Sequence, residues 1–203
     1  CNQREAGKSV LVLDPESEYY DLCSNLGGTY IDMMSGEFMI NPLEPKVWSD
    51  DKKAADDSPE TFRKVTRLSQ HISYLKDFFR AYKDFSDAEI DTIEIMLSKL
   101  YARWGITEET DLRQLIPEDY PILSDLYDLM QEELAHYKSG ALYTQELLQE
   151  VLLGLHSLCV GADAPFFNGH TNISGDRFLV FGVGGVLTAA KSLRNVLLFN
   201  VLA

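Results

Sequence analysis

Residues 10–19 have the sequence VLVLDPESEY, and this stretch decides the fold class. Val10 to Leu13 are all apolar, so a strand made of them has no polar face, which is typical of a strand buried on both sides in a parallel sheet. Pro15 lacks a backbone N–H group and therefore ends the strand after Asp14. The stretch predicts a parallel strand over residues 10–14 and an α/β fold around it.

After this strand a short helix is expected over residues 16–26, because Gly27 and Gly28 form a helix-stop signal. Residues 29–32 predict a second short strand. Turn-forming residues follow it, and the polar, charged segment 49–60 is expected to be mobile.

Far along the chain a third buried strand is predicted at residues 177–183. Gly184 and Gly185 turn the chain after it, and an apolar helix is expected to begin near Thr188. The order of strand, helix and strand at both ends of the chain supports the α/β class.

The middle of the chain, residues 58–160, has a different pattern. Four segments repeat apolar residues at spacings of three and four, as amphipathic helices do. Capping signals precede them: Ser58 with Pro59, the capping box from Ser86 to Glu89, Ser124 and Thr144. The apolar stripes are Val65, Leu68, Ile72, Leu75, Phe79 and Tyr82; Ile90, Ile93, Leu97, Leu100 and Trp104; Leu126, Met130, Leu134 and Tyr137; and Leu148, Val151, Leu155 and Leu158.

Short capped helices of this kind pack within a bundle more often than as coiled coils. We therefore predict an α/β core over residues 1–57 and 161–203, interrupted by an all-α insertion at residues 58–160.

Composition excludes several classes of function. The 203 residues carry a formal net charge of −14 without a basic cluster, so we expect no direct binding of nucleic acid. The cysteines are too few and too widely spaced for a disulfide framework or a zinc site, and the histidines lack metal-binding spacing. The chain begins at Cys1 and stops within an apolar run, and we expect both ends to be cuts through a longer protein.

Two glycine-containing segments resemble nucleotide loops without matching them. Ala6-Gly7-Lys8-Ser9 would need a glycine where Asn2 stands, and a strand follows where the phosphate-binding helix should begin. We interpret Gly7 as a helix cap instead. The glycines from Gly182 to Gly185 lack the third glycine of a dinucleotide loop, which favours a plain strand-to-helix turn.

The carboxylates of Asp14, Glu16 and Glu18 are the candidate catalytic residues. They follow a buried strand at the carboxyl edge of the predicted sheet, where ligands of open α/β sheets bind. Carboxylates there can order a metal-bound water or accept its proton. An acidic first turn that favours the start of a helix explains the same residues equally well.

The segment VLDPESEY at residues 12–19 resembles the strand-end motif of conjugative type IV secretion ATPases of the TraE/TraC and VirB type. A related motif occurs in the wider HerA/FtsK-like P-loop group. Further similar segments follow in the family's order: 27–30 with 40–43, 121–127, 167–173, 178–183 and 198–202. Together they cover nearly the whole chain.

The resemblance implies a partial RecA-like P-loop core with an all-α insertion. It also implies hydrolysis of ATP with Mg²⁺ to power pilus assembly or transfer, in hexamers that contact other secretion components at the inner face of the cytoplasmic membrane. The family's phosphate loop would lie before residue 1 and its Walker B acids beyond residue 203, so this chain alone is expected to be inactive. Only Asp14, Glu16 and Glu18 correspond to family residues near the nucleotide.

Two other functions stay open. In the first, the helical insertion is a docking or oligomerisation module without catalytic activity. In the second, the chain belongs to a HerA/FtsK-like DNA translocase, a function that the acidic net charge disfavours. The roles of Asn168, Thr171 and Asn172 do not follow from the sequence.

Overall fold

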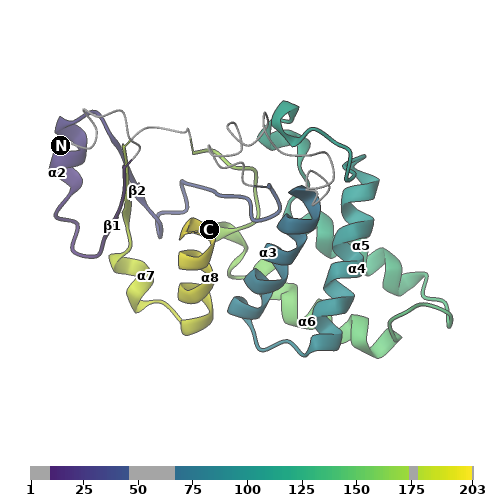
Figure 1. Ribbon diagram of the computed structural model, residues 1–203. Helices are drawn as coiled ribbons and strands as arrows, with labels where there is room; N and C mark the ends of the chain where they lie inside the picture. The colour runs from purple at the N-terminus through teal and green to yellow at the C-terminus, as the bar shows by residue number, and fades with distance from the viewer. Residues whose placement is uncertain (1–9, 46–66, 174–177, 203) are drawn as a thin grey trace.

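The structure, a computed structural model, describes residues 10–45, 67–173 and 178–202. It is a mixed structure in which a small parallel sheet lies at one end and a group of long helices at the other (Figure 1). Several sequence predictions concern residues that the structure does not describe: Lys8, the segment 49–60, Ser58 and Val65. No helix among the residues described is long and apolar enough to cross a membrane.

The sheet contains β1 (Val10–Asp14), β2 (Thr29–Asp32) and β3 (Phe178–Gly182) in the order β1-β3-β2. Both pairings are parallel, which confirms the prediction for the first strand. The other two strands also form where the sequence predicts them, although β3 ends at Gly182 and not at Val183. Residue 177, where the prediction begins, lies outside the described residues. Because β3 lies between β1 and β2, strands far apart in the sequence become neighbours.

One face of the sheet packs against α2 (Tyr20–Asn25), where Cys23, Phe178 and Val180 form a small buried cluster. The prediction that this helix begins at Glu16 is wrong, since residues 16–19 form a turn held by Asp14. Gly27 has φ +62° and ends the helix as predicted, because a glycine adopts that conformation without a steric cost.

The other face of the sheet packs against α8 (Lys191–Leu202) through Ile31, Phe181 and Leu197. The prediction of one apolar helix from Thr188 is wrong in detail. A short helix, α7 (Gly184–Thr188), begins directly after the strand, and the chain breaks at Ala189 before α8 begins. No side chain caps α7, so the sequence offers no start signal there, and the two glycines suit a turn equally well.

The helical part consists of α3 (Arg67–Tyr82), α4 (Asp87–Arg103), α5 (Leu123–Ala135) and α6 (Gln145–Cys159). Short 3₁₀ turns η2 (Leu112–Gln114), η3 (Pro117–Asp119) and η4 (Ala164–Phe166) lie in the connections. The predicted caps form at two helices: Ser86 and Glu89 make the full capping box on α4, and the Thr144 hydroxyl accepts from Leu147 N on α6.

Most residues of the predicted stripes are buried, as amphipathic packing requires. Trp104 is an exception, with 36% of its surface exposed, because it lies at the C-cap of α4 where the helix leaves its neighbours. Phe78 is fully buried although the stripe omitted it, and its ring packs edge-on against Phe167.

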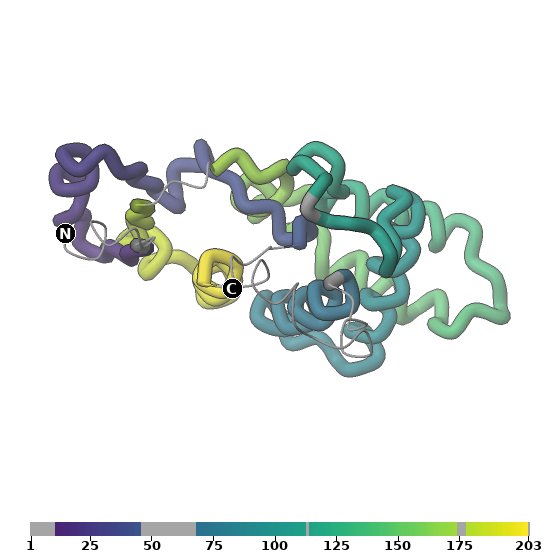
Figure 2. The backbone as a smooth tube through the Cα atoms, turned by 45° about the horizontal axis from the view of Figure 1, so that its top comes forward, coloured from purple at the N-terminus to yellow at the C-terminus, as the bar shows by residue number. Residues whose placement is uncertain are grey.

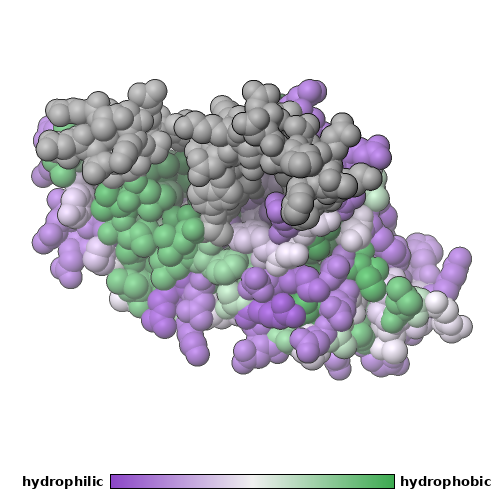
Figure 3. All heavy atoms as spheres, in the orientation of Figure 1, coloured by the Kyte–Doolittle hydropathy of each residue, from purple (hydrophilic) through white to green (hydrophobic). Residues whose placement is uncertain are grey.

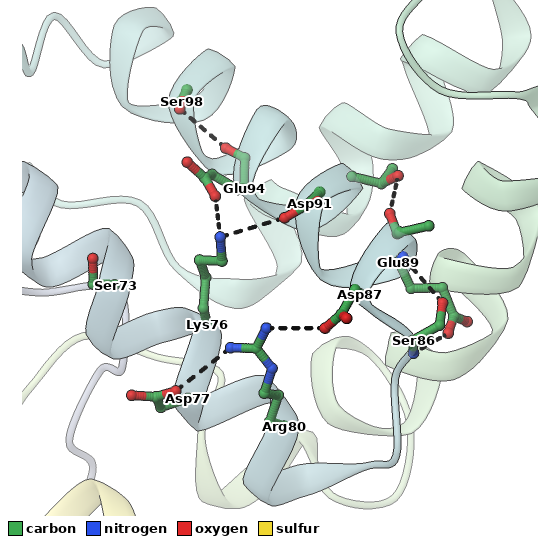
Figure 4. A network of polar contacts seen from close by, with 12 residues as sticks. Ser73, Lys76, Asp77, Arg80, Ser86, Asp87, Glu89, Asp91, Glu94 and Ser98 are labelled. Atoms are coloured by element: carbon green, nitrogen blue, oxygen red, sulfur yellow. Dashed lines mark hydrogen bonds and ion pairs between the residues drawn. The ribbon is translucent and has the colours of Figure 1, made fainter.

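Ion pairs join α3 to α4 on their solvent side (Figure 4). Lys76 of α3 reaches both Glu94 and Asp91 of α4. Arg80 pairs with Asp87 across the same interface at 3.5 Å. The bond to Glu94 raises the pKa of Lys76 above its usual value. The acidic partners in these pairs are largely exposed, so each pair contributes about 1 kcal/mol or less.

The larger of the two hydrophobic clusters found among the described residues runs from the sheet into the helical part. The helix α8 connects the two parts, since it lies between the sheet and α3 in both views (Figures 1 and 2). Tyr74 of α3 stacks on Phe199 of α8 with ring centroids 5.4 Å apart, and its hydroxyl donates to Asn200. The sheet and the helices are therefore packed as one body.

Candidate functional site

The carboxyl edge of the sheet brings three chain turns together. Asp14, Gly182 and Asp32 are in register across the three strands, so the turns that follow them are adjacent. Val183 N donates to Asp14 O at 2.9 Å, and Met33 N donates to Gly182 O at 3.2 Å, which extends the pairing past the strand ends. This is the edge where ligands of open α/β sheets bind.

Asp14 lies at this edge with only 1% of its surface exposed. Its carboxylate accepts hydrogen bonds from the backbone nitrogens of Glu16 (3.3 Å), Glu18 (3.2 Å) and Tyr19 (2.9 Å). These bonds satisfy the buried charge and fold residues 15–19 into a compact turn before α2. Asp14 therefore holds the turn that precedes α2 and does not lie in the first turn of that helix, where the alternative interpretation of the acidic residues would place it.

Glu16 and Glu18 occupy that turn and both are exposed. Their backbone nitrogens point at Asp14 while their side chains reach solvent. Of the three predicted carboxylates, these two are the ones that a ligand or a water molecule at the edge can contact. The structure thus divides the trio into one positioning group and two accessible groups.

Ser17 sits between the two glutamates with φ +59°, in the left-handed region that non-glycine residues seldom adopt. The Tyr30 hydroxyl donates to Ser17 Oγ at 3.3 Å from β2. Strained residues of this kind are concentrated at functional sites, where the surrounding packing enforces them. The turn is therefore set by contacts with the neighbouring strand as well as by Asp14.

Glycines allow the close approach of these turns. A Cβ on Gly182 would lie 2.5 Å from the Tyr30 Oη, and one on Gly184 would lie 2.7 Å from the Pro15 carbonyl oxygen. From the sequence these glycines were predicted only to form a turn, and the contact with Tyr30 was not predicted. A glycine that ends an otherwise apolar strand was the available signal, since it often marks a close approach.

Asp32 adds a further carboxylate that the sequence analysis missed. It ends β2 in register with Gly182, and it is exposed. One carboxylate oxygen accepts from Met34 N at 3.0 Å, which turns the chain away from the sheet. The signal was the same as for Asp14: an acid at the last position of a strand.

The described residues contain no group of three or more His, Cys, Asp or Glu side chains placed to hold a metal ion. The Asp14 carboxylate is largely engaged, since Oδ1 accepts from two backbone N–H groups and Oδ2 from one. The helix α7 is only five residues long. Glu16, Glu18 and Asp32 fit only as contributors to a site that other groups complete.

A second, polar site lies in the helical part, far from the sheet. A groove of about 700 Å³ is bounded by the C-terminal ends of α4 and α5 and by the loop before α6. Lys99 pairs with Glu133, and Arg103 pairs with Glu132 at 2.9 Å. The hydrogen bond from Lys99 holds the pKa of Glu133 below its usual value. Leu142, in the same loop, is 92% exposed.

Comparison with known proteins finds similarity among solved structures. No family model and no curated protein matches the sequence. Among solved structures, VirB4 of Thermoanaerobacter pseudethanolicus matches with a TM-score of 0.81 and 28% sequence identity. The match covers 99% of this chain and 48% of that chain, so this chain spans about half the length of the VirB4 protein. In sequence and in fold, over nearly its whole length, the chain is similar to VirB4, as the strand-end motif at residues 12–19 led us to expect.

Proposed function

We propose that this chain is a region of a motor ATPase that powers type IV secretion or conjugative transfer. The observation that carries the proposal is the match to VirB4 along 99% of the chain. The position of Glu16 and Glu18 at the carboxyl edge of a parallel sheet supports it independently.

In this proposal the sheet belongs to a RecA-like core. Three parallel strands with α2 on one face and α8 on the other are consistent with part of such a core. Residues 1–57 and 161–203 would form it, and residues 58–160 would be the all-α insertion. β1 is an outer strand among those described, and its Leu11 is 47% exposed. Figure 3 shows hydrophobic residues gathered over this end of the molecule, a surface that further parts of a longer protein would cover.

ATP and Mg²⁺ are the proposed cofactors of the longer protein. The phosphates would be held by a loop outside the residues described, since these contain no such cradle. When bound, the nucleotide and metal supply the phosphoryl group and the charge neutralisation that hydrolysis needs. Glu16 and Glu18 would contribute negative charge and hydrogen-bond acceptors for the attacking water. Asp14 would fix their position through the three N–H groups.

The proposed setting is a hexamer at the inner face of the cytoplasmic membrane, in contact with other secretion components. The family resemblance supports this setting. Direct binding of nucleic acid is not part of the proposal, because the chain carries a net charge of −14. The same charge disfavours a DNA translocase.

A docking function of the helical part is the second candidate. The groove beside Lys99 and Arg103 and the exposed Leu142 favour it. It is compatible with the first proposal, because a docking surface can serve the motor.

Steady-state ATP hydrolysis tests the proposal. A protein that contains this chain together with a phosphate-binding loop should hydrolyse ATP, and replacing the lysine of that loop should abolish turnover. Hydrolysis that survives this replacement, or none in the intact protein, would contradict the motor function and leave the docking function as the better account.

A further inference from the structure

Two chain segments cross between the sheet and the helical part: residues 33–45, which follow β2, and residues 161–173, which precede β3. They lie side by side in both orientations of the molecule (Figures 1 and 2). They are about 130 residues apart in the chain, yet side chains of one bind the backbone of the other. We refer to the paired segments as the arm.

The arm is held together by two neighbouring polar side chains. Asn172 Oδ1 accepts from Met39 N at 2.7 Å, and its Nδ2 donates to Glu37 O at 2.9 Å. Thr171 Oγ1 accepts from Asn41 N at 3.0 Å. The backbone adds a bond from Asn172 N to Met39 O at 3.1 Å. These bonds fix the register of the two segments as a strand ladder would.

Two other asparagines fasten the arm to the helical part. Asn41 is fully buried, and its Nδ2 donates to Pro121 O at 2.9 Å, just before α5. Asn168 Oδ1 accepts from Ser124 N at 2.8 Å and thereby caps the first turn of the same helix. Tyr101 of α4 donates its hydroxyl to Leu43 O at 2.6 Å.

At its other end the arm begins at the carboxyl edge of the sheet. Met33 N, the first nitrogen after β2, donates to Gly182 O at 3.2 Å. Asn200 of α8 also reaches the arm, since its Nδ2 donates to Ile40 O at 2.9 Å. The arm thus has hydrogen bonds to the sheet edge, to α8 and to the helical part.

We propose that the arm is a rigid coupling element, held by Asn41, Thr171 and Asn172, that makes the helical part move together with the carboxyl edge of the sheet. Hydrogen bonds suit this role because their strength depends on distance and angle, so a displacement of one segment against the other weakens them. The rigid coupling requires only this chain. A link between the coupling and ATP at the edge of the sheet rests on the proposed function. The experiment below uses no nucleotide, so failure of the coupling can be told apart from failure of the ATPase function.

The test measures the distance between sheet and helical part in variants of the 203-residue chain. Spin labels are placed on exposed positions, Asp21→Cys in α2 and Glu150→Cys in α6, in a Cys1→Ser background. Cys23 and Cys159 are buried and stay in place. Double electron–electron resonance then gives the distance distribution for Thr171→Val and for Asn172→Ala.

Thr144→Val is the matched control. It also removes a threonine hydroxyl that accepts from a backbone nitrogen, at 3.1 Å, but this bond lies wholly within the helical part. Asn172→Asp is the variant closest in shape. It keeps an acceptor for Met39 N, but it replaces the donor to Glu37 O with a carboxylate oxygen that the carbonyl oxygen repels. It serves if Asn172→Ala does not fold.

We expect the distance distribution to broaden in Thr171→Val and in both Asn172 variants and to stay narrow in Thr144→Val. Hydrogen exchange of the Met39 and Asn41 amides should accelerate about fivefold or more in the variants that remove their acceptors, the factor that one net hydrogen bond gives. An unchanged distribution in the Thr171 and Asn172 variants would overturn the proposal. Equal broadening in Thr144→Val would overturn it too, because it would trace the effect to a general loss of stability.

Discussion

The carboxylate of Asp14 lies 2.9 Å from the backbone nitrogen of Tyr19, five residues further along the chain. Together with its bonds to Glu16 N and Glu18 N, this contact closes a turn at the carboxyl edge of the sheet. It explains why the helix starts at Tyr20 rather than at Glu16. It also separates the buried acid, which shapes the turn, from the exposed acids, which are free to contact a ligand.

Asp14→Ala should lower the free energy of unfolding by about 2 to 3 kcal/mol, because it leaves backbone N–H groups at a partly buried site without their charged acceptor. Asp21→Ala is the control, since Asp21 is exposed in the first turn of α2 and its loss should cost about 0.3 to 1 kcal/mol. Urea denaturation measures both. Equal, small losses would show that the Asp14 bonds do not stabilise the turn.

Ser17→Gly should stabilise the chain by about 0.5 to 1 kcal/mol, because glycine adopts a left-handed conformation without the steric cost that serine has at φ +59°. The same change at Ser24, inside α2, should destabilise by about 0.5 to 1 kcal/mol. Opposite shifts of the thermal midpoint are therefore expected. A loss of stability in Ser17→Gly would mean that the Tyr30–Ser17 hydrogen bond outweighs the strain.

The pair Lys99–Glu133 should make stability depend on pH at both extremes. Lys99 lowers the pKa of Glu133 below its usual 4.5, and Glu133 raises the pKa of Lys99 above its usual 10.5. A carboxylate whose pKa is lowered by folding stabilises the folded state above its unfolded pKa, and this stabilisation is lost as the pH falls. An ammonium whose pKa is raised by folding stabilises the folded state below its unfolded pKa, and this stabilisation is lost as the pH rises. The pair therefore contributes between about pH 4.5 and 10.5, by about 1 kcal/mol or less because it is partly exposed.

Glu133→Gln tests this pH dependence, with Glu150→Gln on the exposed side of α6 as its control. Unfolding free energies measured from pH 3 to pH 7 should rise less steeply in Glu133→Gln than in the parent. If both variants follow the parental curve, the pair has no measurable effect on stability.

Local signals in the sequence were sufficient for most of the fold. The strand at residues 10–14 followed from an apolar run and Pro15, and the start of α4 followed from the Ser86 capping box. These features depend on neighbours within a few residues. The start of α2 was wrong because Asp14 holds residues 15–19 in a turn, and that competes with the helical preference of Glu16 and Glu18.

The site was predictable only in part. The sequence identified Asp14, Glu16 and Glu18 as candidates, but it could not tell the buried acid from the exposed ones. Tyr30 was not recognised as part of the site, and no role could be assigned to Thr171, because both roles depend on contacts between distant segments: Tyr30 with Ser17, and Thr171 with Asn41. Such contacts require the topology, in which the late strand β3 lies between two early ones.

The chain by itself should not hydrolyse ATP, since the phosphate cradle is expected in a different part of the longer protein. Phosphate release from a purified sample should equal that of a sample with Lys8→Ala, a residue outside those described. Turnover that depends on Lys8 would revive residues 2–9 as a phosphate loop.

The most direct test of the account is the hydrolysis rate of Glu16→Gln and Glu18→Gln in a protein that contains this chain and its phosphate loop, with nucleotide affinity measured beside it. The account predicts that at least one of them lowers kcat by about 10- to 1000-fold, the scale of one general-base or electrostatic contact, with little change in affinity. Asp14→Asn should act through stability of the turn. Near-parental rates in both glutamate variants would contradict the account and leave VLDPESEY at residues 12–19 as a purely structural motif.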